Sequence, residues 1–416
     1  MLPARLPRRR PASPGRGVRL RQRLRDRAPP ARPRRRPVRG LPRARRAAAR
    51  PRRTPRPRRA RTGTPAARRE AGGVPGLALG AARGPAHRKE PHVTTTPRPT
   101  HASRHSRIGT VGVLVCTHEE RRLPLVTAAV ASLRTQSDPP DHVLVMVDGD
   151  DTLRDTVAAA LPSEDVRGMG HNQGVSAARN AGAEAIGTDW VVFLDDDAEA
   201  DPDWMERLLE PLGPEGVIGA SSRSEPIWDA PRPSWLPDEY LWAWGCSYRG
   251  MPTTRTRVRN PYGGTSVVRR EVFLGLGGYD SAVGHHGDVV GGGEEALFGL
   301  RAARAEAGWF VFEPAAAARH HVPASRLTWG YLARRCYSEG VMKARLSALS
   351  GGDALGDERS FALGLPLATL RCAVRPATAP RAVGLVVATV CVLAGLVSGS
   401  LGGRLARLTR RRTTRG

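Results

Sequence analysis

The chain has 416 residues and a formal net charge of +27, a balance that would ordinarily point to a nucleic-acid partner. The charge is unevenly placed, because residues 1–106 hold 32 of the 66 basic side chains and only three of the 39 acidic ones. The other residues carry 34 basic and 36 acidic side chains. Composition therefore excludes a basic folded domain, and we expect no specific nucleic-acid partner, although binding through the arginine-rich segment is an alternative.

Residues 1–106 consist largely of Arg, Pro and Ala, with few aromatic or β-branched residues. Such a segment cannot bury enough apolar surface to offset its conformational entropy, so we expect it to be disordered. A start codon downstream of much of this segment is an alternative. The segment contains no apolar run of the kind found in a signal peptide.

The five cysteines are scattered, with neither a CxxC motif nor paired spacing: Cys116, Cys246, Cys336, Cys372 and Cys391. This pattern predicts reduced thiols rather than a zinc site or a disulfide framework. We therefore expect the catalytic part of the protein to face the cytoplasm.

Apolar runs typical of buried strands alternate with helical segments from about residue 108 onward. The predicted strands are 111–117, 142–147, a short one around Val166, and 190–197, and the predicted helices are 123–133, 153–161, 174–186 and 202–212. Strands alternating with helices of this length indicate an α/β fold with a mostly parallel sheet and helices on both faces.

Polar clusters follow three of these predicted strands directly, at Thr117–Glu119, Asp148–Asp151 and Asp195–Asp197. Ligands of open α/β sheets bind at the carboxyl ends of the strands. The sequence therefore predicts a ligand site where these three strand ends meet.

The pattern is looser after residue 219, where tryptophans and prolines are frequent. A helix is predicted over 294–307, a last strand over 309–312, and a basic helical region near the membrane over 327–381. We expect the folded catalytic domain to cover 107–326.

Residues 382–403 contain no charged side chain and are flanked by arginines on both sides. About twenty such residues are enough to cross a bilayer as a helix, so we predict a transmembrane helix here and a location at the cell membrane, with a basic tail over 404–416. A buried core helix is the alternative. Arginines on both sides leave the orientation open.

Three consecutive acids, Asp195, Asp196 and Asp197, end the apolar run WVVFLDDD. Like charges this close repel one another unless a cation neutralises them. Carboxylate oxygens suit Mg²⁺ and Mn²⁺, which also bridge to substrate phosphates. The triplet therefore predicts a divalent-metal site.

The order of motifs along residues 110–345 resembles the family-2 glycosyltransferases, which have the GT-A fold. The matching motifs are Thr117–Glu119, the Asp148 strand end, NQGVSAARNAG (172–182), FLDDD (193–197), GGTSVVRREVF (263–273), LGGYD (276–280), Gly293–Glu295, Arg301 and Gly308–Trp309. The resemblance implies an inverting enzyme that transfers a sugar from a nucleotide-sugar donor to a hydroxyl acceptor.

The resemblance also implies residue roles. Donor contacts would come from Thr117, Glu119, Asp148, Arg179, Asp195 and Asp196, and metal contacts from Asp197, Asp195 and His320. Glu295 or Glu294 would be the general base. The family usually has Glu-Asp where this chain has Glu294-Glu295, and the position of Arg301 six residues on supports Glu295 without excluding Glu294. A membrane helix favours a lipid-linked or cell-envelope glycan as acceptor.

Two other functions fit parts of the sequence. A nucleotidyltransferase also uses carboxylate-bound Mg²⁺ on a similar sheet, but it would need a cationic phosphate loop after the first strand, where this chain has the anionic Thr117-His-Glu-Glu. A non-catalytic member of the family is disfavoured by the intact acids.

Overall fold

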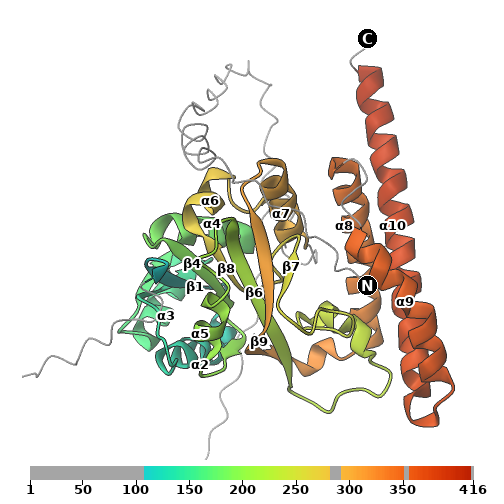
Figure 1. Ribbon diagram of the computed structural model, residues 1–416, viewed down its shortest axis with the longest axis horizontal. Coiled ribbons are helices and arrows are strands. Elements are labelled where there is room, and N and C mark those ends of the chain that lie inside the picture. Colours follow the sequence, from blue (N-terminus) through green and yellow to red (C-terminus); the bar gives the residue numbers. More distant parts are fainter. Residues whose placement is uncertain (1–106, 282–291, 351–355, 414–416) are drawn as a thin grey trace, which may run out of the picture. The chain divides into compact units, whose positions relative to one another are not determined.

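The computed structural model describes residues 107–281, 292–350 and 356–413 (Figure 1). These residues belong to one compact unit, a mixed sheet with helices on both faces and a long C-terminal helix, which confirms the predicted α/β class. The predicted disorder of 1–106 falls outside the described residues.

The N-terminal half of the sheet is parallel, as predicted. Its strands are β1 (Val111–Thr117), β2 (His142–Val147), β3 (Asp165–Gly168) and β4 (Trp190–Asp195). Strand β1 lies between β2 and β4, and β3 pairs with the outer edge of β2. The intervening helices are η2 (Glu120–Arg122), α2 (Leu123–Arg134), α3 (Asp151–Ala160) and α4 (Val175–Ala185).

The second half of the sheet is mixed, which the sequence did not predict. Its strands are β5 (Ala198–Ala200), β6 (Val217–Trp228), β7 (Thr256–Val258), β8 (Thr265–Arg269) and β9 (Trp309–Val322). The strand order is β3-β2-β1-β4-β8-β6-β9-β5, with β7 paired to β9. Strand β8 runs antiparallel to both neighbours, β4 and β6, and this arrangement ends the parallel part of the sheet.

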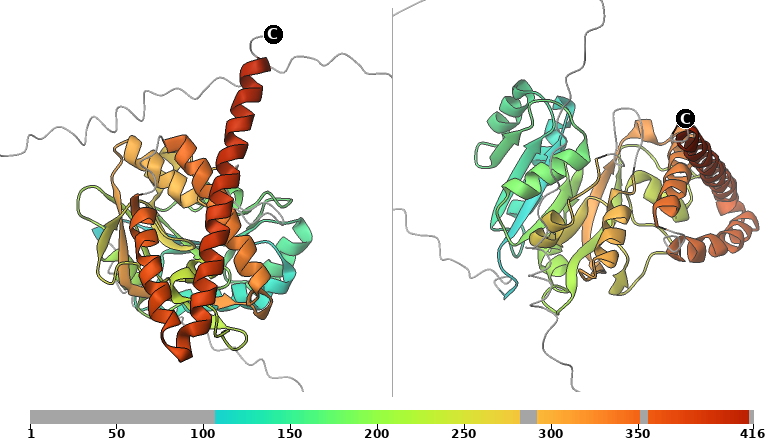
Figure 2. Two further views of the ribbon diagram at one scale, coloured as in Figure 1. Left: turned by 90° about the vertical axis from the view of Figure 1, so that its right-hand side faces the viewer. Right: turned by 90° about the horizontal axis from the view of Figure 1, so that it is seen from above.

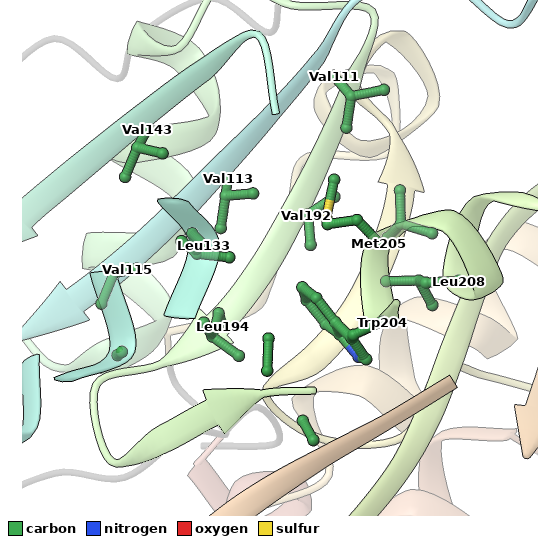
Figure 3. Packing of buried hydrophobic residues seen from close by; sticks show 14 of the residues in the cluster. Val111, Val113, Val115, Leu133, Val143, Val192, Leu194, Trp204, Met205 and Leu208 are labelled. Carbon is green, nitrogen blue, oxygen red and sulfur yellow. The ribbon is translucent and has the colours of Figure 1, made fainter. Parts of the chain in front are cut away.

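Both faces of the sheet are covered, so the central strands are apolar throughout instead of alternating with polar residues. One face packs against α2, α3 and α5 (Trp204–Leu209); Figure 3 shows Val113 and Val192 on this face near Leu133 and Trp204. The other face packs against α4, α6 (Arg270–Gly275) and α7 (Glu294–Arg304).

The C-terminal region is helical, with α8 (Trp329–Ser350), α9 (Gly356–Ala373) and α10 (Ala379–Thr413). The short 3-10 helices of the chain's second half are η3 (Asp238–Trp244), η4 (Ala324–Arg326) and η6 (Pro376–Thr378). A third apolar cluster joins η3, α8, α9 and α10. Helix α10 continues ten residues past the predicted end of the apolar run.

Candidate active site

The carboxyl ends of β1, β2 and β4 meet at one edge of the sheet. Thr117 pairs in register with Val147, and Cys116 pairs with Asp195. The amide of Asp148 donates a 2.8 Å hydrogen bond to the backbone oxygen of Thr117. The three polar clusters predicted to be neighbours therefore lie side by side.

Asp148 connects the end of β2 to the start of α4. Its buried carboxylate accepts hydrogen bonds from the amides of Gln173 (2.6 Å) and Gly174 (2.9 Å). Gly174 has a φ of 92°, which favours glycine, and it is the residue that precedes α4. Asp148 thus fixes the turn that leads to Arg179.

Glu119 stands apart from the buried acids. Its side chain is about one-third exposed and pairs with Arg121 and with His118 at 3.5 Å. These salt bridges hold the pKa of Glu119 below its usual value, chiefly through the hydrogen bond from Arg121. The structure therefore places Glu119 at the solvent-facing edge of the site.

Asp195, Asp197 and His320 form a group that could hold a metal ion, with one ligand atom from each lying within 4.8 Å of the others. Pairing of β5 with β9 brings His320 there, because Ala198 is opposite His320. The Nδ1 atom of His320 lies 3.2 Å from Oδ1 of Asp197. Sequence reasoning ended the last strand at residue 312. The strand in fact continues to Val322, so His320 lies on β9 rather than after it.

Arg122 is the site residue that sequence reasoning missed. Its guanidinium contacts Asp196 at 2.5 and 2.8 Å and Asp197 at 2.6 Å. Burial alone would raise the pKa of Asp197, but His320 and Arg122 hold it below its usual value. For Asp196 burial prevails, and the pKa is raised. The sequence offered only a weak signal for this residue, namely an arginine a few positions after the first predicted strand.

Asp196 makes different contacts from Asp195 and Asp197. Both of its oxygens are engaged by Arg122, while Asp195 and Asp197 share the group with His320. The hard oxygen donors of that group, with one imidazole, fit a divalent cation.

Arg179 links the two ends of the site. Its Nη2 donates a 2.8 Å hydrogen bond to Asp195, and its Nη1 lies 3.5 Å from Glu295 and 3.7 Å from Glu294. Both glutamates lie in the first turn of α7. The arginine therefore spans the distance between the strand-end acids and the predicted base, although 116 positions separate Arg179 from Glu295.

Glu294 and Glu295 are both removed from bulk water. Burial, followed by the charge of Glu294, raises the pKa of Glu295 to about 8, and Arg179 opposes this rise. The Oε2 atom of Glu294 is buried, and no described residue forms a hydrogen bond to it. Glu295 is the more exposed of the two side chains.

Three further contacts fix the geometry of the cluster. A methyl group on Gly264 would lie 1.8 Å from Oδ1 of Asp195, so only glycine leaves room for that carboxylate. Asn180, next to Arg179, exchanges two 2.8 Å hydrogen bonds with the backbone of Tyr279. Arg301 binds Asp280 at 2.5 Å, which anchors the same turn to α7.

The sequence profile described as glycosyl transferase family 2 matches residues 112–277. Glucosyl-dolichyl phosphate glucuronosyltransferase from Haloferax volcanii is 31% identical over 244 residues, which are 58% of this chain and 78% of the relative. The succinoglycan biosynthesis protein ExoM from Rhizobium meliloti is 24% identical over 249 residues, 57% of this chain and 75% of that protein.

Among solved structures, mannosyltransferase PcManGT from Pyrobaculum calidifontis in complex with GDP-Man and Mn²⁺ is similar, with a TM-score of 0.45 and 17% identity over 68% of this chain and 87% of that one. The structure of GalNAc-T7 with UDP, GalNAc and Mn²⁺ has a TM-score of 0.40 and 18% identity, over 61% of this chain and about half (54%) of that one.

Proposed function

The chain belongs to the family-2 glycosyltransferases, and from that premise we propose that its strand-end cluster is the active site, where a nucleotide-sugar donor and a hydroxyl acceptor meet. The observation that carries the proposal is the position of Arg179, within 2.8 Å of Asp195 and 3.5 Å of Glu295. One side chain thereby joins the acids suited to bind a divalent ion to those suited to accept a proton.

The donor site is assigned to the edge formed by β1 and β2. Thr117 and Asp148 lie at adjoining strand ends, with Glu119 at the exposed margin. The carboxylate of Asp148 accepts one backbone hydrogen bond on each oxygen, which leaves lone pairs for an N–H of the nucleotide base. Asp196 supports this side of the site by holding Arg122.

The metal site is assigned to Asp195, Asp197 and His320, with Mg²⁺ or Mn²⁺ as the ion. A bound divalent ion would supply charge stabilisation for the departing diphosphate. Arg122 holds Asp197 in place, and the backbone oxygen of Asp197 accepts a 2.8 Å hydrogen bond from the amide of His321. The ligands are therefore positioned before any ion binds.

The general base is assigned to Glu295. An inverting transfer needs one carboxylate that removes the proton from the attacking hydroxyl. Glu295 is more accessible than Glu294, and its raised pKa places it within reach of neutral pH. Arg179 orients both carboxylates and opposes protonation of Glu295. Glu294, buried and bound only weakly to Arg179, is assigned to orienting the sugar.

The acceptor is proposed to be a lipid-linked sugar or a cell-envelope glycan. The Haloferax relative is named for acting on glucosyl-dolichyl phosphate, and the Rhizobium relative for succinoglycan biosynthesis. In this chain the helix around 376–402 is long and apolar enough to enter a membrane. We accordingly propose a membrane location. In this proposal 1–106 is a tail, 107–326 is the catalytic domain and 327–381 is the membrane-proximal region.

A nucleotidyltransferase and a nucleic-acid-binding protein, which the sequence left open as alternatives, are not favoured by these relatives. Neither relative is named for such an activity. The described active-site residues are also acidic at the first strand end, which does not suit a nucleoside triphosphate.

A donor screen tests the proposed function. The full chain in detergent is incubated with Mn²⁺ or Mg²⁺, a panel of nucleotide sugars and a membrane lipid extract, and release of nucleoside diphosphate is measured. We expect one donor to be consumed only when metal is present. The matched controls are Asp197→Asn, expected to be inactive, and Asp203→Asn, a mostly exposed acid outside the site, expected to be active. Equal turnover in all three proteins would contradict the proposal.

A further inference from the structure

The apolar helix α10 contacts the rest of the described chain at both ends of its apolar stretch. That stretch lies within Pro376–Gly402, whose most apolar window of 18 residues has a mean hydropathy of 2.3. Near its beginning, a methyl group on Gly384 would lie 2.1 Å from the backbone oxygen of Trp235; near its end, one on Gly399 would lie 2.9 Å from Cβ of Ala344. These two glycines are about 22 Å apart along the helix.

Between these points α10 lies directly on α8. A methyl group on Gly340 would come within 2.0 Å of the backbone oxygen of Val392, and one on Gly395 within 2.0 Å of that of Tyr337. The hydroxyl of Tyr337 also binds that of Ser398 at 2.8 Å. Small residues allow two helices to approach this closely, so one side of α10 is committed to protein contacts.

Helix α8 is unsuited to the interior of a bilayer. Arg334 and Arg345 are exposed on it, and Glu339 pairs with Arg335 at 3.1 Å and with Lys343 at 3.2 Å. If α10 crossed the membrane while keeping its contacts, the Tyr337–Ala344 part of α8 would lie deep in the hydrocarbon beside residues 392–399. Charged side chains are strongly disfavoured there.

The other side of α10 is exposed and apolar. Its large exposed residues recur at helical spacing, and they are Val383, Val386, Val390, Leu393, Val397 and Leu401. Helix α9 and the residue that follows it repeat the pattern with Leu363, Leu367, Leu370 and Val374, of which Leu363 is 81% exposed. Figure 2 shows α9 and α10 on the same side of the molecule. We call these ten residues the apolar face.

The apolar face is bordered by cations where α9 meets α10. Arg371 and Arg375 are exposed there, and Arg381 pairs with Asp238 at 3.2 Å. An exposed apolar strip with arginines along its margin is typical of a helix that lies in the interface of an anionic membrane. The charge and the hydropathy both fit a lipid surface.

We propose that α9 and α10 hold the protein to one leaflet of the membrane through the apolar face, and that α10 lies along the bilayer surface without crossing it. This topology differs from the transmembrane helix that the sequence predicts. The inference rests on the membrane location in the proposed function, and it does not depend on the reaction.

Sidedness of the chain ends tests the topology. The full-length chain carries one epitope tag before Met1 and another after Gly416, and it is incorporated into sealed vesicles of phosphatidylcholine and phosphatidylglycerol. We consider the vesicles on which the N-terminal tag faces outward. If α10 does not cross the bilayer, antibodies added outside these vesicles should bind the C-terminal tag as well as the N-terminal tag. A C-terminal tag that becomes accessible only after detergent is added would overturn the proposal. Because sugar transfer is not measured, this result is independent of the proposed function.

Flotation tests the apolar face itself. The double variant Leu367→Glu/Leu370→Glu should bind such vesicles about tenfold or more weakly than the wild type, because charges replace two exposed leucines that would enter the lipid. The control, Ala131→Glu/Ala159→Glu, adds the same charge at exposed positions of α2 and α3 and should float normally. Equal flotation of both variants would overturn the proposal, as would a full-length chain that is a soluble dimer without detergent.

Discussion

The guanidinium of Arg179 donates a 2.8 Å hydrogen bond to the carboxylate of Asp195. The same guanidinium lies within 3.7 Å of both glutamates at the start of α7. Burial of this arginine is tolerated because three carboxylates surround it, and their charges raise its pKa further above the usual value despite burial. Arg179 therefore connects the candidate metal ligand Asp195 to the proposed base.

Replacing Arg179 by lysine should separate the charge of this residue from its geometry. Lysine keeps the positive charge but has a single donor group, so it cannot hold Asp195 and Glu295 together. We expect turnover to fall by about a hundredfold or more and the pH at which activity appears to rise. Steady-state kinetics across pH measures both. Wild-type kinetics in Arg179→Lys would show that the bridge has no role.

Glu295→Gln should remove proton acceptance while keeping size and hydrogen bonding. Transfer to the acceptor should fall by roughly two to four orders of magnitude, the usual share of general-base catalysis, whereas donor affinity should change little. Glu294→Gln is the matched variant and should lose less turnover or raise the donor KM. Reversal of these two results would assign the base to Glu294. Glu295→Asp should also be slower, if the site fits the longer side chain.

The pH dependence of wild-type activity and stability follows from the raised pKa of Glu295, about 8 against an ordinary 4.5. A base must be ionised, so the rate should rise with pH up to about 8.

Stability should also depend on pH. The folded state binds the proton of Glu295 more tightly than the unfolded state does. The contribution of this proton to the free energy of unfolding is therefore complete below pH 4.5 and is lost as the pH rises through 8. Glutamine does not titrate, so Glu295→Gln should not lose stability in this way. Its Tm should be higher than that of the wild type at pH 8.5, and the two Tm values should differ less at pH 4.5. An equal difference at both pH values would contradict the shift.

Gly264→Ala should displace Asp195 without touching any other acid. The added methyl group would lie 1.8 Å from Oδ1 of Asp195, so that carboxylate must leave Arg179. We expect a folded protein, by circular dichroism, with activity reduced by about a hundredfold. Gly330→Ala is the control, since a methyl group there meets nothing within 4 Å. Full activity in Gly264→Ala would mean that Asp195 can move freely.

The parallel half of the sheet could be predicted because its strands are buried on both faces. Runs such as 111–117 and 190–195 are then continuously apolar, and each ends abruptly at polar residues. Strand β6 and the part of β9 after residue 312 escaped prediction because they contain prolines, alanines and exposed polar residues, including Pro226, Pro314 and Arg319. These strands are held extended because they pair with each other over many residues. The sequence of either strand alone does not indicate that pairing.

The sequence predicted that the strand-end acids of the candidate site lie together, because each of these acids follows a recognisable strand. The role of Arg122 could not be predicted, since an arginine at the start of a helix is ordinarily a surface residue. The burial of Arg122 depends on the fold of the loop after β4. The side of α10 that packs on α8 was equally hidden. Gly340 and Gly395 become meaningful only when the two helices are seen in contact.

The placement of the active site at Asp195, Asp197 and His320 can be tested by calorimetry of UDP and GDP binding with and without Mn²⁺, on the wild type, Asp197→Asn and Asp203→Asn. We expect at least one nucleotide to bind the wild type and Asp203→Asn only with metal. Asp197→Asn should lose this metal-dependent binding, while its Tm without metal indicates a folded protein. Metal-dependent binding of the same affinity in Asp197→Asn would contradict the placement of the active site at this cluster.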